Sequence, residues 1–593
     1  MTADVLEAEA VAWDAPAREP WHGLLDYYGY HAPSGAWCFV GWVEQRHIAP
    51  DKPTTADLRI DFESGTLSGP GIVTYFYRPD LGERGSGMVV HFPSSGRGMG
   101  RPVWLELCSA DRTAGLTVPS GCQHLRGADL GARLFAELSN AEDASESRTT
   151  LLGLLLRKGF TGEDTLGALK DEVRLELDAV IACRPEGVVL MGWMAAAPEV
   201  VRAIRLRAGL AAAPVTERNT LRVPRPDVLE ALGPDRAEPD CGFMAYCALP
   251  ASGAEPMHLE IETARGEVGY KPVPAPRGGG IEAIKRVLSA FDLRYDQLAP
   301  AFDGVAGPAV RALNAERLRQ RPRVGVVTLG RPHPAPRHSV IVPLYGRIDF
   351  LEYQAALFAR HGLPDAELIY VLDDPPRRRE LEALAASVHE RFQVPLRLLM
   401  LDRNMGFAPA NNVALARARG EFVCFMNSDV FPGAPGWLAA LSRRLEDDPG
   451  LGAVGPLLLF ENGSVQHQGM DFERLEEFGG WMFPTHPRKG LKPPAGAALL
   501  HSPAITAACL VMRRALADEL GGFDEAYVIG DFEDSDLCLR VGQLGLACAV
   551  DPSVRLYHLE RRSQVGAAQR WRMNMTLYNA WTHQGRWIGG ARG

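Results

Sequence analysis

Oxygen-bearing side chains follow two apolar runs in the second half of this 593-residue chain. Asp373-Asp374 comes directly after the run 367–372, and Asn427-Ser428-Asp429 comes directly after the run 421–426. Carboxylates placed like the first pair can accept hydrogen bonds from the N–H groups or hydroxyls of a nucleotide. Oxygens spaced like the second set can bind a hard divalent cation and, through it, a diphosphate. Each segment also has a structural interpretation. The first could be an Asx turn before Pro375-Pro376, and the second could be a strand-end turn or a helix N-cap.

A third acidic segment, 530–540, opens an amphipathic helix and concentrates its carboxylates at positions 531, 533, 534 and 536. The helix dipole accounts for one or two of them structurally. Four in six residues exceed what capping needs, and like charges held together perturb pKa values in the way that a general base requires. His558 follows the strand-like run 552–557, and a lone histidine there is more often structural than a metal ligand.

Alternating strand and helix patterns surround these segments and must position them. The sequence predicts strands at 339–342, 367–372, 396–401 and 421–426. It predicts helices after each of them, at 350–360, 378–391, 409–419 and 437–445. Such alternation implies a mostly parallel sheet covered by helices, with ligand groups at the carboxyl ends of the strands.

The rest of the chain divides by pattern into further regions, because 593 residues exceed one hydrophobic core. Period-2 alternation predicts two β-sandwich-like modules, and helical spacing predicts the segments between them. The expected organisation is therefore a β module at 1–125, a helical connector at 126–174, a second β module at 175–278, a helical segment and linker at 279–337, and the α/β domain at 338–593.

Short matches between the two β modules favour a tandem duplication. In order, and at nearly constant separation, they are Gly41-Trp42-Val43 with Gly192-Trp193-Met194, Arg78-Pro79-Asp80 with Arg225-Pro226-Asp227, and Leu105-Glu106-Leu107 with Leu259-Glu260-Ile261. Aromatic residues expected to be exposed, such as Tyr27, Tyr28 and Trp37, could bind glycan by stacking on sugar rings or could mediate assembly. Trp42 and Trp193 are better interpreted as core residues at matching positions.

Composition and charge exclude several functional classes. The net charge is −10, and basic residues cluster no further than Arg377-Arg378-Arg379, which disfavours a nucleic-acid partner. Ten scattered cysteines without a CxxC pair indicate reduced, buried thiols. The acidic start of the chain lacks the pattern of a secretory signal, and no apolar run reaches the ~20 residues of a membrane helix. We therefore expect the protein in the cytoplasm, either free or held at the inner face of the membrane.

Together, the motifs of residues ~338–565 resemble the family 2 glycosyltransferases of the GT-A fold, in the branch of bacterial rhamnosyltransferases and other cell-surface polysaccharide enzymes. The resemblance is carried by Ser339-Val340-Ile341-Val342-Pro343-Leu344-Tyr345, Asp373-Asp374, Asn404-Met405-Gly406-Phe407-Ala408, Asn411-Asn412, Asn427-Ser428-Asp429, Val454-Gly455-Pro456, Gln466-His467-Gln468-Gly469, Ala508-Cys509-Leu510-Val511-Met512, Gly521-Gly522-Phe523-Asp524-Glu525, Glu533-Asp534-Ser535-Asp536-Leu537 and Tyr557-His558.

This resemblance implies a site for a nucleotide-sugar donor. The residues that it places at the donor are Pro343 and Tyr345 in the nucleotide pocket, Asp373 at the base with Asp374 nearby, Asn404, Gly406 and Asn411 around ribose and diphosphate, and Asn427 with Ser428 beside them. It further implies that Asp429 holds Mg²⁺ or Mn²⁺ against the diphosphate, with His558 as a further ligand.

The resemblance also implies the chemistry. Asp534 is expected to be the general base that removes a proton from an acceptor hydroxyl, so that the acceptor attacks the anomeric carbon and inverts it. Glu533, and either Trp481 or His467, are expected to face acceptor or donor sugar. The expected activity is transfer of a hexosyl or deoxyhexosyl group to a glycan or lipid-linked acceptor.

Two departures and two rival functions remain at this point. Pro375-Pro376 stands where the family commonly has Gly-Ser and removes two backbone donors, and Asn427 replaces the first carboxylate of the metal motif. A non-catalytic glycan-binding or scaffold protein with a degenerate transferase domain is the main alternative, which the presence of both Asp429 and Asp534 disfavours. A nucleotidyltransferase is disfavoured because the loop 343–347 lacks a glycine-rich phosphate-binding pattern.

Overall fold

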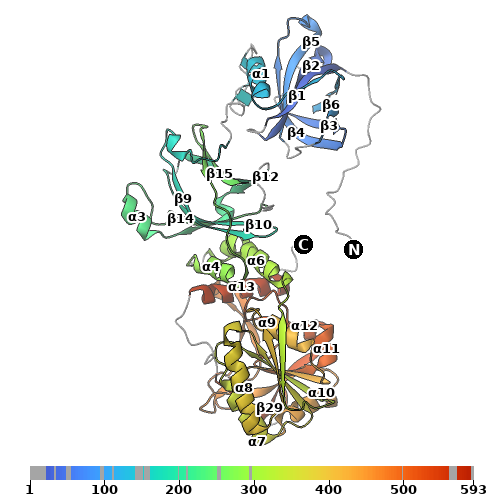
Figure 1. Ribbon diagram of the computed structural model, residues 1–593, viewed down its shortest axis with the longest axis vertical. Coiled ribbons are helices and arrows are strands. Elements are labelled where there is room, and N and C mark those ends of the chain that lie inside the picture. Colours follow the sequence, from blue (N-terminus) through green and yellow to red (C-terminus); the bar gives the residue numbers. More distant parts are fainter. Residues whose placement is uncertain are drawn as a thin grey trace. The chain divides into compact units, whose positions relative to one another are not determined.

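The structure is a computed structural model, and its chain forms two compact units (Figure 1). Unit 1 comprises residues 1–174, 196–214 and 254–273, and unit 2 comprises residues 175–195, 215–253 and 274–593. The described residues are 22–31, 35–47, 55–93, 99–109, 112–139, 148, 151–152, 160–197, 199–208, 211–249, 256–292, 297–496, 498–559 and 570–588.

The first β module, in unit 1, is a ring of strands. Its strands are β1 (Gly23–His31), β2 (Ala36–Glu44), β3 (Thr55–Phe62), β4 (Gly65–Phe76), β5 (Gly85–Pro93), β6 (Pro102–Ser109), β7 (Arg112–Thr117) and β8 (Gln123–His124). They pair in the order β2-β5-β4-β3-β6-β7-β1-β8, and β1 also pairs with β2, which closes the ring. The sandwich-like prediction for this module is therefore corrected to a barrel-like sheet, since alternation is the same in both architectures.

The aromatic residues considered for sugar stacking lie in the interior of this module. Tyr27, Tyr28 and Trp37 are only 2%, 4% and 3% exposed. Helix α1 (Gly127–Ser139) packs on Tyr27 through leucines spaced four residues apart. The proposed stacking role was wrong for these three residues, because period-2 alternation does not say which face of a strand is covered.

The second β region consists of two four-stranded sheets. In unit 1, β12-β11-β15-β16 pair in this order, with bounds β11 (Val201–Ala208), β12 (Ala211–Val215), β15 (Met257–Thr263) and β16 (Val268–Pro272). In unit 2, β13-β14-β10-β9 pair in this order, with bounds β9 (Arg174–Cys183), β10 (Gly187–Ala195), β13 (Thr220–Val223) and β14 (Gly242–Cys247). The short helix α3 (Pro226–Leu232) follows β13.

An arginine with two aspartate partners occurs in each β module. Arg78 donates to Asp26 of β1 at 2.5 Å and to Asp80 at 2.6 Å. Arg225 donates to Asp178 of β9 at 2.6 Å and to Asp227 at 2.7 Å. We call these two clusters the arginine staples. Each joins an Arg-Pro-Asp turn to the first strand of its own module.

The C-terminal sheet of unit 2 has eleven strands. They are β17 (Val324–Leu329), β18 (His338–Leu344), β19 (Ala366–Leu372), β20 (Leu396–Leu401), β21 (Phe422–Met426), β22 (Val430–Pro432), β23 (Leu451–Leu459), β24 (Val465–His467), β27 (Leu500–Ser502), β28 (Cys509–Arg513) and β29 (Ala547–His558). The main order is β17-β20-β19-β18-β21-β28-β23-β29-β22, and β25 (Asp471–Leu475) pairs with β26 (Trp481–Thr485) in a separate hairpin.

The sheet is mixed rather than mostly parallel. Only β18–β19, β18–β21, β19–β20 and β23–β29 pair in parallel. The mostly parallel prediction was drawn from the regular alternation before residue 445, and the later strands do not follow it. A second correction concerns residues 324–329, which were predicted as linker and instead form the antiparallel edge strand β17. The arginines and prolines around this strand hid its short β-branched run.

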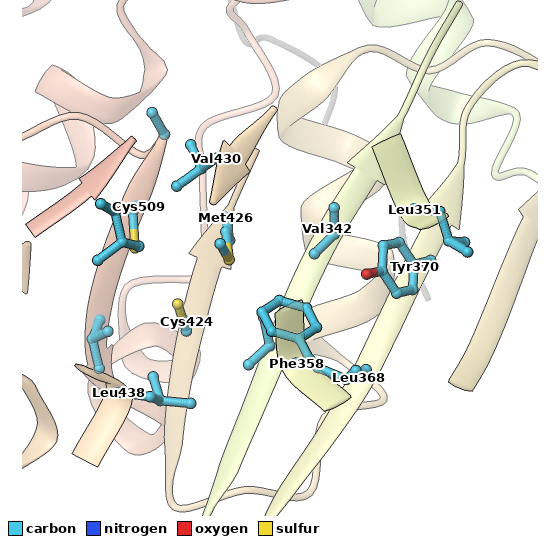
Figure 2. Packing of buried hydrophobic residues seen from close by; sticks show 14 of the residues in the cluster. Val342, Leu351, Phe358, Leu368, Tyr370, Cys424, Met426, Val430, Leu438 and Cys509 are labelled. Carbon is cyan, nitrogen blue, oxygen red and sulfur yellow. The ribbon is translucent and has the colours of Figure 1, made fainter. Parts of the chain in front are cut away.

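Helices cover both faces of the sheet. They are α7 (Phe350–His361), α8 (Arg378–Phe392), α9 (Phe407–Leu415), α10 (Trp437–Asp447), α11 (Arg514–Glu519) and α12 (Glu533–Gln543). Alternate residues of β18 face opposite sides: Val340 and Val342 pack with α7, α8 and α10, whereas Ile341 packs with α9, α11 and α12. Figure 2 shows Tyr370 of β19 beside Leu351 of α7 in the first of these cores.

A helical layer of unit 2 packs together outside the sheet. It consists of α4 (Gly280–Ser289), α5 (Leu298–Ala301), a π-helical turn (Phe302–Ala306), α6 (Gly307–Arg319) and α13 (Arg570–Trp587). Figure 1 shows α4, α6 and α13 side by side, and their apolar residues form one core with Trp481. All ten cysteines are unpaired thiols, and eight of them are buried. Within the described ranges, none of the helices has the length and apolar character that crossing a membrane requires.

Candidate active site

The carboxyl ends of β18 and β19 place the predicted nucleotide-binding residues at one edge of the sheet. Tyr345, directly after β18, is 50% exposed, so its ring is open to a planar ligand. Pro343 is half-buried within β18. Asp374, after β19, accepts a hydrogen bond from the Gly346 amide at 3.2 Å. This hydrogen bond connects the loop after β18 to the loop after β19. Tyr345 lies in the first of these loops, between the end of β18 and Gly346.

Asp373 is a buried acceptor for the backbone of the loop after β20. It is 4% exposed, and its two carboxylate oxygens accept the amide N–H groups of Met405 at 2.6 Å and Gly406 at 2.7 Å. Burial raises the pKa of this carboxyl to about 7, against the opposing effect of the two amides and of Arg317. Asp373 therefore shapes the turn that carries Asn404 and Gly406.

Gly406 allows this turn to approach the segment before α12. Its φ is +85°, and a Cβ there would lie 2.9 Å from the Cα of Ile529. The neighbouring Phe407 amide donates to the Ile529 carbonyl at 2.6 Å. A side chain at position 406 is thus opposed both by backbone conformation and by space.

Several buried polar atoms around these loops lack a hydrogen-bond partner among the described residues. They are Oδ1 of Asn404, Oδ1 of Asn411, Oε2 of Glu533 and Nδ1 of His558. Buried polar groups are almost always hydrogen-bonded in native proteins, so orphaned atoms call for a ligand, an ion or water. All four belong to residues that the sequence predicted for the site.

Asp429 and His558 come together on paired strands. β22 and β29 are antiparallel with Val430 opposite His558, and the Asp429 Oδ1–His558 Nε2 distance is 3.4 Å. Both side chains are buried, at 3% and 7% exposure. No group of three potential ligands from His, Cys, Asp and Glu lies together in the described part of the chain. One oxygen and one nitrogen donor fit a divalent ion that completes its coordination with ligand oxygens and water.

Asp534, the predicted base, lies in the first turn of α12 and is half-buried. Its Oδ2 accepts the Ala507 amide at 3.2 Å. The next residue, Ala508, accepts the Asn427 amide through its carbonyl at 2.9 Å. Two consecutive residues therefore connect the candidate base to the start of the candidate metal triplet.

The other acids of this helix differ in their surroundings. Glu533 is buried, and its pKa is raised well above the usual range by burial and by the nearby charges of Asp534 and Asp531. Asp536 is fully buried but saturated: Arg540 donates to it at 2.8 Å and the Trp587 indole at 3.0 Å. Asp536 is therefore a structural residue, whereas Glu533 retains an unpartnered oxygen.

His467 and Trp481, the two residues considered for sugar contact, are interior residues. His467 is 1% exposed; its Nδ1 lies 2.9 Å from Nδ1 of His486, and its Nε2 accepts the Thr506 amide at 3.1 Å. Trp481 is 7% exposed and packs edge-on against Phe302 with ring centroids 5.7 Å apart. Through the Thr506 amide, His467 bonds to the backbone next to Ala507.

Two buried residues of the helical layer also reach the site loops, and sequence reasoning missed both. Arg317 of α6 is 5% exposed and donates to the Met405 carbonyl at 2.6 Å. Asn579 of α13 is fully buried and bonds to the backbone of 528–531. A polar residue inside a helix gives no sequence signal that distinguishes a buried partner from a solvated side chain.

Comparisons with known proteins cover part of the chain. Residues 339–521 match the family described as Glycosyl transferase family 2. The O-antigen biosynthesis protein RfbC of Myxococcus xanthus is 31% identical over 253 residues, which cover 42% of this chain and 19% of that protein. The N-acetylglucosaminyl-diphospho-decaprenol L-rhamnosyltransferase of Mycobacterium tuberculosis (strain ATCC 25618 / H37Rv) is 30% identical over 193 residues, which cover 28% of this chain and 60% of that protein. The chain thus spans less than two thirds of either relative.

Among solved structures, the mannosyltransferase PcManGT from Pyrobaculum calidifontis in complex with GDP-Man and Mn²⁺ is 19% identical. The match covers 51% of this chain and 76% of that protein, with a TM-score of 0.30. A TM-score of this size supports no inference about ligands, so the interpretation of the site depends on its own geometry.

Proposed function

We propose that the chain, whose residues 339–521 match Glycosyl transferase family 2, is an inverting transferase of surface polysaccharide or glycoconjugate synthesis. It moves a hexosyl or deoxyhexosyl group from a nucleotide-sugar to a glycan or lipid-linked acceptor, within a catalytic domain at 338–593. The observation that carries the proposal is the link through Ala507 and Ala508, which holds Asp534 beside the strand end of Asn427.

In this mechanism Asp534 takes the proton of the acceptor hydroxyl. The acceptor oxygen then attacks the anomeric carbon from the side opposite the leaving nucleotide, which inverts its configuration. The amides of Ala507 and Ser535 fix Oδ2 and Oδ1 of Asp534, and the remaining lone pairs are proposed to face the acceptor. Glu533 is placed to hold a sugar hydroxyl through its unpartnered oxygen.

The donor is proposed to lie between Tyr345 and the turn at Gly406. Tyr345 stacks on the base, and the orphaned amide oxygens of Asn404 and Asn411 accept donor hydroxyls. Asp429 and His558 would hold Mg²⁺ or Mn²⁺. When bound, such an ion neutralises charge on the departing nucleoside diphosphate.

The β modules are proposed to be tandem copies that recognise the acceptor or position the catalytic domain. The matching arginine staples support the duplication, because each pairs one arginine with two aspartates, one in the Arg-Pro-Asp turn and one in the first strand of the module. The names of the relatives support an acceptor on a lipid diphosphate or a growing glycan, since one of them acts on N-acetylglucosaminyl-diphospho-decaprenol.

A thermal-shift screen tests the donor site. The full chain is heated with UDP, GDP, dTDP and CMP and with their sugar conjugates, each with and without Mn²⁺. A ligand at a hundredfold excess over its Kd stabilises the folded state by about 2.7 kcal/mol. We expect one nucleotide to give a metal-dependent shift that Asp429→Ala removes. If no nucleotide shifts the unfolding temperature, the transferase proposal fails.

A further inference from the structure

We propose that Asn579 of α13 is a positioning residue for catalysis, because it holds the backbone 528–531 that leads into the helix of Asp534. The proposal rests on the proposed function, since it takes Asp534 as the base. Asn579 lies 58 positions beyond the family match, which ends at residue 521. The family domain thus depends on a helix outside it.

The segment that Asn579 holds is strained. Ile529, Asp531 and Phe532 have φ values of 64°, 83° and 74°, a left-handed conformation that residues with a side chain rarely adopt. Phe532 is the N-cap residue of α12, and no side chain caps this helix end. Strained conformations persist only where the surroundings hold them, and they cluster at functional sites.

The Asn579 carboxamide supplies four hydrogen bonds to this strained segment. The Asn579 Nδ2 donates to the carbonyls of Val528, Gly530 and Asp531 at 3.1, 2.7 and 3.2 Å. Its Oδ1 accepts the Val528 amide at 2.9 Å. The side chain has no exposed surface, so water cannot substitute for these bonds.

The held segment contacts both halves of the site. The Ile529 carbonyl accepts the Phe407 amide at 2.6 Å, which connects it to the proposed donor turn. Phe532 leads directly to Glu533 and Asp534. A second residue of α13, Thr576, donates to the Asp531 carboxylate at 2.8 Å. Movement of 528–532 would therefore displace the base relative to the donor.

The same helix provides a matched control. Asn574 is 3% exposed, and its Nδ2 donates to the carbonyls of Leu288 and Phe291 at 2.7 and 3.0 Å. Asn574→Ala removes a buried carboxamide from α13, as Asn579→Ala does, but its bonds lead to α4 and not to the site. Both variants should lower the unfolding temperature, which separates loss of stability from loss of positioning.

The experiment compares transfer kinetics and amide hydrogen exchange in the full chain, using the donor that the thermal screen identifies. We expect Asn579→Ala to lower kcat at least tenfold with donor KM changed less than threefold, and to speed exchange in peptides covering 528–534. Asn574→Ala should keep kcat within twofold and leave that exchange unchanged. The proposal is overturned if both variants lose kcat equally, or if Asn579→Ala keeps its kcat.

A second, milder variant on the same helix tests the proposal if Asn579→Ala does not fold. Thr576→Val removes the hydroxyl that bonds to the Asp531 carboxylate and to the Arg572 carbonyl of its own helix. It should lower kcat about threefold while speeding exchange at 528–534, and unchanged exchange and kcat would overturn the proposal. If the wild-type chain transfers no sugar from any donor while Asn579→Ala still speeds exchange selectively at 528–534, the proposed function fails but the hold of Asn579 on this segment stands. The two failures are thus distinguishable.

Discussion

At the scale of single residues, the acids at the start of α12 separate by how far their oxygens are already occupied. Asp536 is saturated by cationic and aromatic donors, whereas Asp534 accepts only backbone amides, those of Ala507 and Ser535. A general base must have a lone pair free to receive a proton. Each oxygen of Asp534 accepts one amide, Oδ2 from Ala507 and Oδ1 from Ser535, and so keeps a lone pair, whereas Oδ1 of Asp536 has Tyr527, Trp587 and Arg586 as partners.

Asp534→Asn should therefore abolish transfer without abolishing donor binding. General-base catalysis contributes roughly 10²- to 10⁴-fold, and we expect kcat to fall by about that factor. The metal-dependent thermal shift with the donor should persist, because the proposed role of this carboxylate is towards the acceptor. Asp518→Asn, which removes an exposed partner of Arg514 on α11, is the control and should transfer normally. Normal turnover by Asp534→Asn would show that another group is the base.

Glu533 should make stability depend on pH in a defined direction. Its folded-state pKa is raised, so the folded chain holds this proton more tightly than the unfolded chain does. The resulting stability is complete below the ordinary Glu pKa and is lost as pH rises towards the raised value. Unfolding temperatures of the wild type and Glu533→Gln across pH 5–9 test this. The wild type should lose more stability with rising pH than the variant, and parallel profiles would contradict the assignment.

At the scale of elements, the regular part of the α/β domain could be predicted and the later part could not. The four helices expected between 350 and 445 are present as α7 to α10, because their strands are buried on both faces and their boundaries carry clear signals. β17 was missed because arginines and prolines flank its short apolar run on both sides. The antiparallel pairing of β28 and β23 depends on long-range contacts that no local pattern reveals.

Some residues of the candidate site could likewise be predicted from the sequence, and others could not. Asp373, Asp429 and Asp534 were found because acids at strand and helix ends are informative. The sequence could not show that both oxygens of Asp373 are used by the turn at 405–406. It could not reveal Arg317 or Asn579 either, since each partner lies about 50 residues or more away along the chain.

Gly406→Ala should disrupt the turn that approaches the pre-helix segment. A Cβ at position 406 would meet the Cα of Ile529 at 2.9 Å, and the backbone there, with φ +85° and ψ 173°, lies in a region open essentially to glycine, which adds roughly 1–3 kcal/mol. We expect the donor-induced thermal shift to shrink. Gly362→Ala is the matched control, because its φ is +70° and nothing lies within 4 Å of the added carbon. If both variants lose donor binding equally, the close approach is not the cause.

At the scale of the whole molecule, each unit has its own core, and the family match covers only part of unit 2. The helical layer of α4, α6 and α13 belongs to the same unit as the sheet and contributes Arg317 and Asn579 to its loops. The compact unit that contains the candidate site is therefore larger than the region that matches the family. One arginine staple lies in unit 1 and the other in unit 2, and neither includes a residue of the candidate site.

If the modules are tandem copies, their staples should contribute equally. In double-mutant cycles, Arg78→Ala with Asp26→Ala and Arg225→Ala with Asp178→Ala should give similar coupling energies. Both aspartates are substantially exposed, at 41% and 50%, so each coupling should be modest, about 0.2–1 kcal/mol. Calorimetry at matched salt measures them, and the metal-dependent nucleotide shift should be unchanged in every variant, because neither staple includes a site residue. A coupling in one module and none in the other would argue against a shared ancestral turn and leave the matching sequences as coincidence.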